Sequence, residues 1–392
     1  MNRRHLLKSL ATLPFAGWGG QLLSAPAASP RFLLVFLRGG YDAASLLVPH
    51  GSAFYYESRP NIAIAPPGPD ANAALPLDAD WGLHPVLRDS LYPLYQARQL
   101  AFVPFAGTDD LSRSHFETQD SIELGTTGAG QYQSGFLNRL AAVLSGTPAI
   151  AFTEQLPLIF RGELQVANLA LRQLDRPGLD ARQSRIVAAM YRDTPLAQQV
   201  LEGFATREDV QKTLQTEMDG AGRQAISTRG FEQEARRIAK LMRDRYGLGF
   251  VDVGGWDSHV GQGAATGYLA SRLDELGRGL AAFADEMGPR WADTVVVVIS
   301  EFGRTFRENG NRGTDHGHGS VYWVLGGQLA GGRVAGEQVR VERASLFQNR
   351  DYPVLNDYRP LLAGLFARLY GLGPAQLATV FPGAGARDLG LL

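Results

Sequence analysis

The sequence predicts an α/β fold in which a doubly wound, mainly parallel sheet carries helices on both faces. Several short runs are apolar at nearly every position, which is typical of strands covered on both faces. These runs alternate with segments of helical periodicity, the order expected for parallel strands joined by crossover helices. With 392 residues, of which 45% are hydrophobic, the chain can bury an extensive core.

Six segments are predicted strands. The clearest is Asp293–Ile299, in which every residue after the first is β-branched. Arg31–Leu37 is apolar after its first residue and is followed closely by the paired glycines 39 and 40. The other predicted strands are Leu100–Phe105, Ala149–Phe152, Gly249–Val253 and Val321–Leu325.

Helices are predicted between these strands. Apolar residues from Leu269 to Phe283 recur at spacings of four and three, the pattern of one buried helix face. Asp357–Tyr370 is a further helix, which Gly371 is expected to cap. The remaining predicted helices are Val86–Ala97, Ile186–Phe204 and Gly230–Arg245. Residues 29–392 are expected to form one domain with a mostly helical insertion around 160–245, and residues 56–80 a surface loop or a segment lining the site.

Composition narrows the possible functions. The formal net charge is −1, from 38 basic and 39 acidic residues, so no basic excess favours nucleic acid as a partner. Cysteine is absent, which excludes disulfides, thiolate nucleophiles and thiolate metal ligands. Any metal must therefore be held by oxygen and imidazole.

The N-terminus resembles an export signal. Residues 2–8 read Asn-Arg-Arg-His-Leu-Leu-Lys, and a modestly apolar stretch ends near the small residues Ala25 and Ala27. This pattern resembles a twin-arginine signal, so we expect residues 1–28 to direct the chain to the export machinery and the periplasm, or otherwise out of the cytoplasm. An ordinary Sec signal or an uncleaved anchor is the alternative. The stretch is too short for a stable membrane span after processing.

Acidic residues follow three of the predicted strands. Asp42 follows the first strand, Asp257 and His259 follow 249–253, and Glu301 follows 293–299. In open α/β sheets, ligands bind beyond the carboxyl ends of the strands. We therefore expect these side chains to share one crevice.

A glycine-rich loop, 313–319, adds Asp315, His316 and His318 just before the strand at 321–325. Converging carboxylates would repel one another without a cation, so the pattern predicts one or two divalent ions. Imidazole and carboxylate suit zinc or manganese best, with iron, calcium or magnesium as alternatives. The candidate ligands are Asp42, Asp257, His259, Glu301, Asp315, His316 and His318.

Several of these residues have simpler interpretations. Asp42 can cap the helix that follows it. Asp257 and His259 can belong to a solvated turn, and Glu301 can form a surface ion pair with Arg304 or Arg307. The prediction of a metal site depends on the whole set of residues.

A further candidate segment begins at Asp109. Ser112 or Ser114 would lie at a helix N-terminus, which favours an anion or an alkoxide, and His115 would serve as a base or as a metal ligand. The simpler interpretation is a helix cap in which Ser114 pairs with Glu117.

The motifs resemble a known family. In order they are Leu-Arg-Gly-Gly-Tyr-Asp42, Arg113-Ser-His-Phe116, Gly-Gly-Trp-Asp257-Ser-His259, Ser300-Glu-Phe-Gly-Arg-Thr305, Asp315-His-Gly-His-Gly319 and Val380-Phe-Pro-Gly383. Together they resemble the bacterial domain-of-unknown-function family 1501 over nearly the whole mature chain. That family is similar, more distantly, to the alkaline phosphatase and sulfatase superfamily.

The resemblance implies an alkaline-phosphatase-like fold and a role for each motif. Asp42 matches the first-strand acid, Asp257 and His259 match the ligands of one metal, and His316 or His318 matches the last histidine ligand. Ser114 is the closest match to the nucleophile. Two departures put the second metal in doubt: Glu301-Phe302 stands where Asp-His is usual, and the spacing from Asp257 to His259 is short.

The leading functional prediction is an exported, metal-dependent hydrolase of phosphate or sulfate esters. Ser114, His115 and Arg304 are its candidate catalytic residues, and Arg304 or Arg113 would stabilise charge on the transferred group. The alternative is a non-catalytic periplasmic binding or assembly protein that keeps the fold and a vestigial metal site. A dinucleotide-binding oxidoreductase is excluded because no G-x-G-x-x-G follows the first strand.

Overall fold

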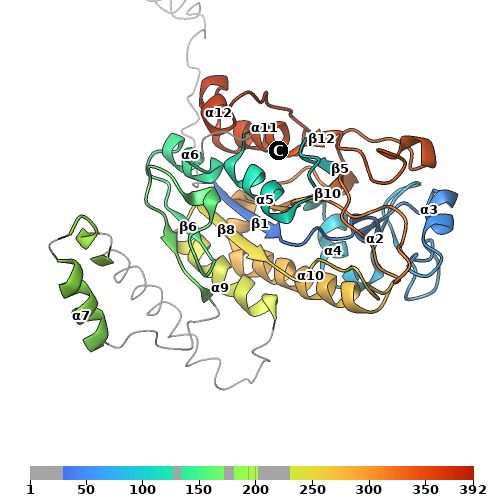
Figure 1. Ribbon diagram of the computed structural model, residues 1–392, viewed down its shortest axis with the longest axis horizontal. Helices are drawn as coiled ribbons and strands as arrows, with labels where there is room; N and C mark the ends of the chain where they lie inside the picture. Colours follow the sequence, from blue (N-terminus) through green and yellow to red (C-terminus); the bar gives the residue numbers. More distant parts are fainter. Residues whose placement is uncertain (1–29, 127–133, 172–180, 193, 199, 202–229) are drawn as a thin grey trace, which may run out of the picture.

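One large twisted sheet forms the centre of the molecule (Figure 1), in the order β11-β5-β10-β9-β1-β8-β6-β7, with β12 also paired to β5. The strands are β1 Arg31–Leu37, β5 Leu100–Gly107, β6 Ala149–Ala151, β7 Ala167–Asn168, β8 Leu248–Val253, β9 Thr294–Ser300, β10 Ser320–Gly326, β11 Arg333–Val334 and β12 Asn356–Asp357. All six predicted strands are therefore confirmed, with ends shifted by at most two residues. Of these strands, β10 alone runs antiparallel to its neighbours.

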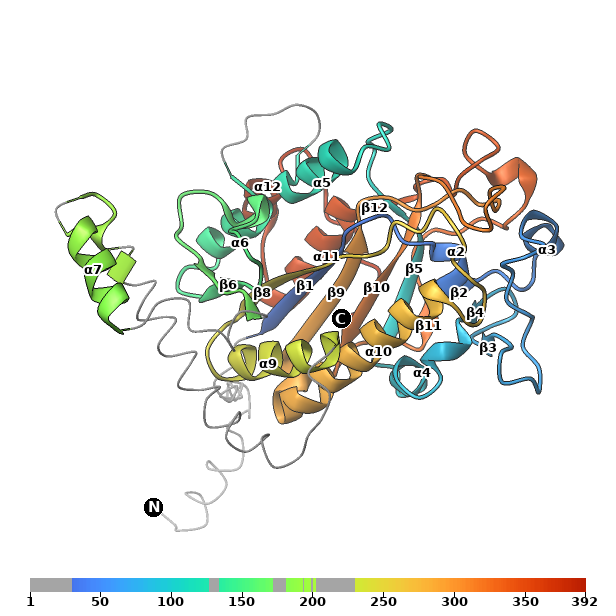
Figure 2. The same cartoon turned by 60° about the horizontal axis from the view of Figure 1, so that its bottom comes forward.

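Helices cover both faces of this sheet, as predicted (Figure 2). Alternate residues of β1 enter two different cores: Val35 packs in one with Leu273, and Leu34 packs in the other with Leu362. Such two-sided burial explains the unbroken apolar runs of the strands. The first core is covered by α4 Leu91–Gln96, α9 Phe231–Asp244 and α10 Tyr268–Met287; the second by α5 His115–Leu124, α6 Phe136–Val143, α11 Tyr358–Tyr370 and α12 Pro374–Val380.

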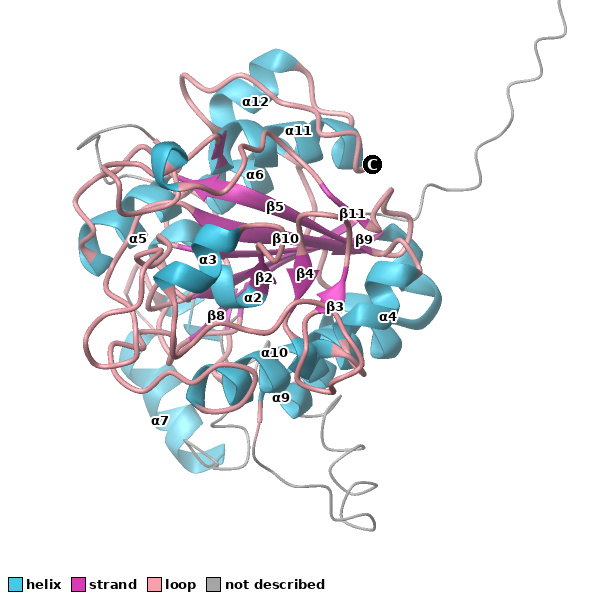
Figure 3. Cartoon of the chain, turned by 90° about the vertical axis from the view of Figure 1, so that its right-hand side faces the viewer, coloured by secondary structure: helices cyan, strands magenta, loops and turns pink. Residues whose placement is uncertain are grey.

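A small antiparallel sheet lies beside the main one (Figure 3), built from β2 Leu47–Val48, β4 Gly82–Leu83 and β3 Leu75–Pro76. It lies close to the short helices α2 Ala43–Leu46 and α3 Ala53–Ser58. Residues 56–80, expected to be a surface loop or to line the site, include the end of α3 and all of β3. Much of this segment is exposed, but Arg59 within it is completely buried.

The predicted helices are present with two differences. The helix expected at 86–97 is divided into a 3-10 turn, Pro85–Leu87, and α4, which begins at Leu91. This start places Pro93 in the first turn of α4, where its missing N–H needs no partner within the helix. The helix expected at Ile186–Phe204 is interrupted: α7 Ala181–Tyr191 ends first, residues 197, 198, 200 and 201 are helical again, and Phe204 lies outside the described residues. At the C-terminal end, the predicted cap is confirmed, because Gly371 adopts a left-handed conformation after α11.

The computed structural model describes residues 30–126, 134–171, 181–192, 194–198, 200–201 and 230–392. The predicted export signal at 1–28 and much of the predicted insertion at 160–245 lie outside these ranges. The remaining 3-10 helices are Leu158–Phe160, Gly288–Asp293 and Arg343–Ser345. Within these ranges, no helix combines the length and apolar character needed to cross a membrane.

The direction of β10 decides where the loops meet. Because β1, β5, β8 and β9 run one way and β10 the other, the carboxyl ends of the first four lie at the same edge as the amino end of β10. The loop before β10 therefore reaches the edge directly. The segments after β5, β8 and β9 arrive at that edge from the other strands.

Candidate metal centre

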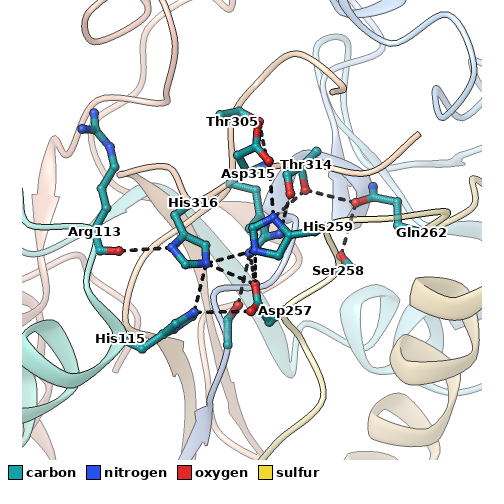
Figure 4. Close-up of polar contacts among 12 residues, drawn as sticks. Arg113, His115, Asp257, Ser258, His259, Gln262, Thr305, Thr314, Asp315 and His316 are labelled. Carbon is teal, nitrogen blue, oxygen red and sulfur yellow. Dashed lines mark hydrogen bonds and ion pairs between the residues drawn. The ribbon is translucent and has the colours of Figure 1, made fainter. Parts of the chain in front are cut away.

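Three histidines and one aspartate gather at this edge of the sheet (Figure 4). His115 begins α5 after β5, Asp257 and His259 lie in the loop after β8, and His316 lies in the loop before β10. An isolated antiparallel bridge joins the backbones of Arg304 and His316, which holds the His316 loop beside the segment leaving β9. The four side chains come from three segments that are distant in the sequence.

The donor atoms of three of these residues are close enough to share one ion. The Nε2 atoms of His115 and His316 are 3.0 Å apart, and Asp257 Oδ1 is 3.2 Å from His316 Nε2. Asp257 Oδ2 is 3.6 Å from His115 Nε2. One donor from each of the three lies within 4.8 Å of the others. Two donors of a tetrahedral zinc ion are about 3.3 Å apart, so these spacings fit a shared ion.

His259 adds a fourth donor beside this group. Its Nε2 lies 2.9 Å from Asp257 Oδ1 and 3.2 Å from the Nε2 atom of His316. The side chains remain accessible, with 44% of the Asp257 side chain and 42% of the His259 side chain exposed. The centre is thus open to solvent on one side, whereas structural zinc sites are closed by four protein ligands.

Each histidine ring is held through its other nitrogen. The Nδ1 atoms lie 2.7 Å from Glu301 Oε1 for His115, 3.3 Å from Asp315 Oδ1 for His259, and 3.2 Å from the Arg113 carbonyl for His316. All three neighbours accept hydrogen bonds, so we assign the ring proton to Nδ1 in each histidine.

This assignment leaves three Nε2 lone pairs facing one another beside a carboxylate. None of these atoms can then donate a hydrogen bond to another. A cation between them removes the repulsion, and a partner on Nδ1 is the usual arrangement around a metal-binding histidine. The residues present therefore fit a divalent ion.

The electrostatics agree with an ionised Asp257. Burial by itself would raise the pKa of Asp257, but the hydrogen bond and the charge of Arg304, whose Nη1 is 2.6 Å away, hold that pKa below its usual range. The hydrogen bond to Glu301 raises the pKa of His115, whereas burial and the neighbouring charges of His115 and Arg304 lower the pKa of His316.

Glu301 lies behind His115 and orients it. Its carboxylate, completely buried, accepts bonds from the Gly39 N–H at 2.7 Å, Gln119 Nε2 at 2.8 Å and Ser300 Oγ at 2.9 Å. The simpler interpretation of Glu301 as a surface ion pair is therefore wrong. Gln119 was not among the predicted residues, although its position one helical turn after His115 places both on one face of α5.

Asp42 is occupied elsewhere. Its carboxylate accepts hydrogen bonds from both terminal nitrogens of Arg59, at 2.5 and 2.9 Å. It also accepts them from Gln262 Nε2 at 2.6 Å and Ser45 Oγ at 2.7 Å. With its oxygens fully engaged and 1% of the residue exposed, Asp42 is not part of the metal group, contrary to expectation. It stands at the N-cap position of α2, but its side chain makes no capping bond.

Two other predicted ligands also stand outside the group. Asp315 reaches the centre only through the Nδ1 atom of His259 and is held by Asn309 at 3.0 Å. His318 is buried, with its ring 5.1 Å from that of Phe347. The glycine-rich loop therefore contributes one residue to the donor group, His316, because the ring of His318 is buried beside Phe347.

Phe302 occupies the position where the resemblance leads one to expect a histidine. Its ring packs 4.9 Å from that of His115 and 5.1 Å from that of His316. An apolar ring thus borders these two histidines.

The candidate catalytic residues have distinct positions. Arg304 is buried and contacts Asp257 together with the Thr314 carbonyl at 2.5 Å. Ser114 caps α5, with its Oγ accepting from the Glu117 N–H at 3.5 Å. His115 lies among the metal donors, so of its two predicted roles the geometry favours the ligand.

Comparison with known proteins identifies the family and a weaker structural likeness. Residues 29–381 match the family described as "Protein of unknown function (DUF1501)", and no curated protein matches the sequence significantly. Among solved structures, the chain is similar to an alkaline phosphatase superfamily protein from Vibrio parahaemolyticus, at 12% identity and a TM-score of 0.38, covering 87% of this chain and 66% of that one. It is also similar to the PsFucS1 sulfatase from Pseudoalteromonas sp., at 11% identity and a TM-score of 0.35, covering 78% of this chain and 64% of that one. The chain thus spans slightly less than two thirds of the length of these two proteins.

Proposed function

Since the chain belongs to the DUF1501 family and brings these donors together, we propose that it is an exported, metal-dependent hydrolase of phosphate or sulfate esters. The observation that supports this proposal is the group of His115, Asp257 and His316, whose donor atoms converge on a side open to solvent. Catalytic metal sites in proteins keep such an open position beside three protein ligands.

His115, Asp257 and His316 would hold the ion, and the neighbouring His259 would bind it only in place of water or substrate. Zinc or manganese suits a site of imidazole and carboxylate best. When bound, a divalent ion supplies Lewis-acid polarisation of a substrate oxygen and lowers the pKa of a water molecule.

The surrounding residues prepare the site for an anionic substrate. Glu301 and Asp315 keep the rings of His115 and His259 in one tautomer and orientation. Arg304 compensates the charge of Asp257, so the bound ion leaves the site with net positive character. Such a field attracts and stabilises the oxygens of a phosphate or sulfate group.

The second candidate function is a non-catalytic binding or assembly protein that retains one metal. Two observations favour it: Asp42 is closed off by Arg59, and Phe302 lies where a second metal would need a ligand. One metal per chain without turnover would support this alternative.

The test combines metal counting with a substrate panel. Purified protein is loaded with zinc or manganese, its metal content is measured, and hydrolysis of p-nitrophenyl phosphate, bis-p-nitrophenyl phosphate and p-nitrophenyl sulfate is followed. We expect about one ion per chain and a turnover that disappears in Asp257→Asn and His316→Ala. His50→Ala is the matched control, because the His50 ring, whose Nε2 lies 3.1 Å from the Asp78 carbonyl, is outside the group. Ester hydrolysis that persists without metal, or in both variants, contradicts the proposal.

Export through the twin-arginine route is tested separately. Replacing Arg3 and Arg4 with lysine should leave the unprocessed precursor in the cytoplasm, whereas replacing Lys8 with arginine should not. Processing and export of the double-lysine variant at the normal rate would instead support the Sec alternative.

A further inference from the structure

A buried carboxylate, Asp351, connects two arginines that touch the metal centre from different sides. The Asp351 side chain is completely shielded from solvent, and it lies outside the donor group. Arg113 reaches it through Nε at 3.1 Å and Nη2 at 2.8 Å. Arg350 reaches it through Nη1, at 3.0 and 3.2 Å from its two oxygens.

Both arginines also form hydrogen bonds with His316. The Arg113 carbonyl lies 3.2 Å from Nδ1 of the His316 ring, and Arg350 Nη2 donates to the His316 carbonyl at 2.7 Å. Asp351 thus fixes the ring of His316 at one end and its backbone at the other. No other carboxylate in the described ranges is shown to bond to both Arg113 and Arg350.

The backbone of Arg113 is held in a conformation that it would not adopt freely. Its φ is 53°, in the left-handed region, which is unfavourable for any residue other than glycine. The side-chain bonds to Asp351, and to Gln348 Oε1 at 2.9 Å, keep Arg113 there. This conformation aims the Arg113 carbonyl at His316, and His115 follows two residues later.

We propose that Asp351 is a positioning residue for the metal centre, which acts through Arg113 and Arg350 to fix the tautomer and orientation of His316. The inference rests on the metal site of the proposed function but not on any turnover. Residues that orient metal ligands typically change metal affinity about 10–100-fold when replaced. A neutral residue at position 351 leaves two cations without their shared carboxylate, so the carbonyl of Arg113 is no longer held against His316.

The test measures metal binding to the full mature chain. Zinc affinity is determined by competition with a chromophoric chelator, and the visible spectrum of the cobalt-loaded protein reports the geometry of the ligands. Asp351→Asn should weaken zinc binding about 10–100-fold and change the cobalt spectrum. Asp388→Asn is the matched control, because Asp388 also accepts two bonds from one arginine, Arg368, in the C-terminal segment. It should change neither measurement.

A second pair of variants keeps the proposal testable if Asp351→Asn fails to fold. Arg113→Ala and Arg113→Gly both remove the side chain, but glycine adopts the left-handed conformation without strain. If the arginine acts by holding its own carbonyl, Arg113→Gly should recover part of the zinc affinity that Arg113→Ala loses.

The outcomes separate this inference from the metal site itself. Tight zinc binding by the wild type that is unchanged in Asp351→Asn and Arg113→Ala overturns the positioning role and leaves the metal site standing. A wild type that binds no divalent ion overturns both. Failure to hydrolyse any ester affects neither measurement.

Discussion

Two charged clusters lie at the same edge of the sheet, and they differ in how their charges are balanced. In the first, Asp42 is buried and its charge is neutralised by Arg59 within the protein. In the second, Asp257 lies among His115, His259 and His316 and is partly exposed. The first cluster is complete without any ligand, whereas the second presents unshared lone pairs. Position after a parallel strand therefore does not decide whether an acid is available to a metal; its hydrogen-bond partners do.

The largest expected effect comes from breaking the first cluster, in which Arg59 neutralises the buried Asp42. Replacing Arg59 with methionine leaves the charge of Asp42 buried without its counter-charge, which typically costs about 3–5 kcal/mol. Urea unfolding should show this loss, while the zinc affinity of the folded variant stays within about twofold of wild type. Arg368→Met, which breaks an exposed pair with Asp388, should cost about 1 kcal/mol or less. Zinc affinity that falls along with stability in the Arg59 variant would show that the two clusters are coupled.

The buried histidine His84 predicts that the free energy of unfolding depends on pH. Burial lowers the pKa of His84 to about 4, and its Nε2 lies 3.1 Å from the Ala264 carbonyl. The unfolded chain binds the proton near pH 6.5 and the folded protein only near pH 4, so this histidine destabilises the fold as the pH falls between those values. The full effect is about 3 kcal/mol.

His84→Gln removes this titration and keeps a donor and an acceptor. The free energy of unfolding of the variant relative to wild type should therefore rise steadily from pH 7 to pH 4.5. A difference that stays constant across this range would mean that His84 is protonated in both states or in neither.

The second cluster, around Asp257, should make the free energy of unfolding depend on metal. A divalent ion at about 100 times its dissociation constant adds about 2.7 kcal/mol to the free energy of unfolding. Excess chelator should remove this increment from the wild type and from Arg59→Met alike, since neither loses a donor. His316→Ala should show no increment, and an increment of wild-type size in that variant would place the ion elsewhere.

The smallest expected effect concerns Ser114. Loss of an N-cap hydroxyl typically costs about 0.5–2 kcal/mol, and its long bond to Glu117 places Ser114→Ala at the lower end. Thermal unfolding should detect the change, and zinc affinity should be unaltered. A variant that folds and binds metal normally but loses all ester hydrolysis would restore Ser114 as the nucleophile.

The fold and the meeting of the loops were predictable because they depend on local pattern. Unbroken apolar runs identify strands buried on two faces, and the acids that follow them mark the ligand-binding edge. This reasoning correctly located Asp257, His259 and His316 at one rim. It did not reveal that β10 runs antiparallel, because a strand buried on both faces has the same composition in either direction.

The role of each acidic residue within the site was not predictable from the sequence. Asp42 and Glu301 both follow buried strands, but Arg59 bonds to the first and His115 to the second, and both partners come from other segments of the chain. Arg59 lies in an irregular stretch 17 residues after Asp42, and Asp351 follows His316 by dozens of residues. Sequence spacing indicates which residues reach an edge. It does not indicate which acid contacts an ion and which holds a histidine, since that depends on side-chain hydrogen bonds.

The order of the donor residues along the sequence also determines when the group can form during synthesis. His115 leaves the ribosome first, Asp257 follows much later, and His316 with the β10 segment comes last. An ion at this site would therefore find all of its proposed ligands only after His316 has been synthesised. A precursor exported after folding would already carry its ion in the cytoplasm, so the metal content of precursor retained by an export block should equal that of the mature protein.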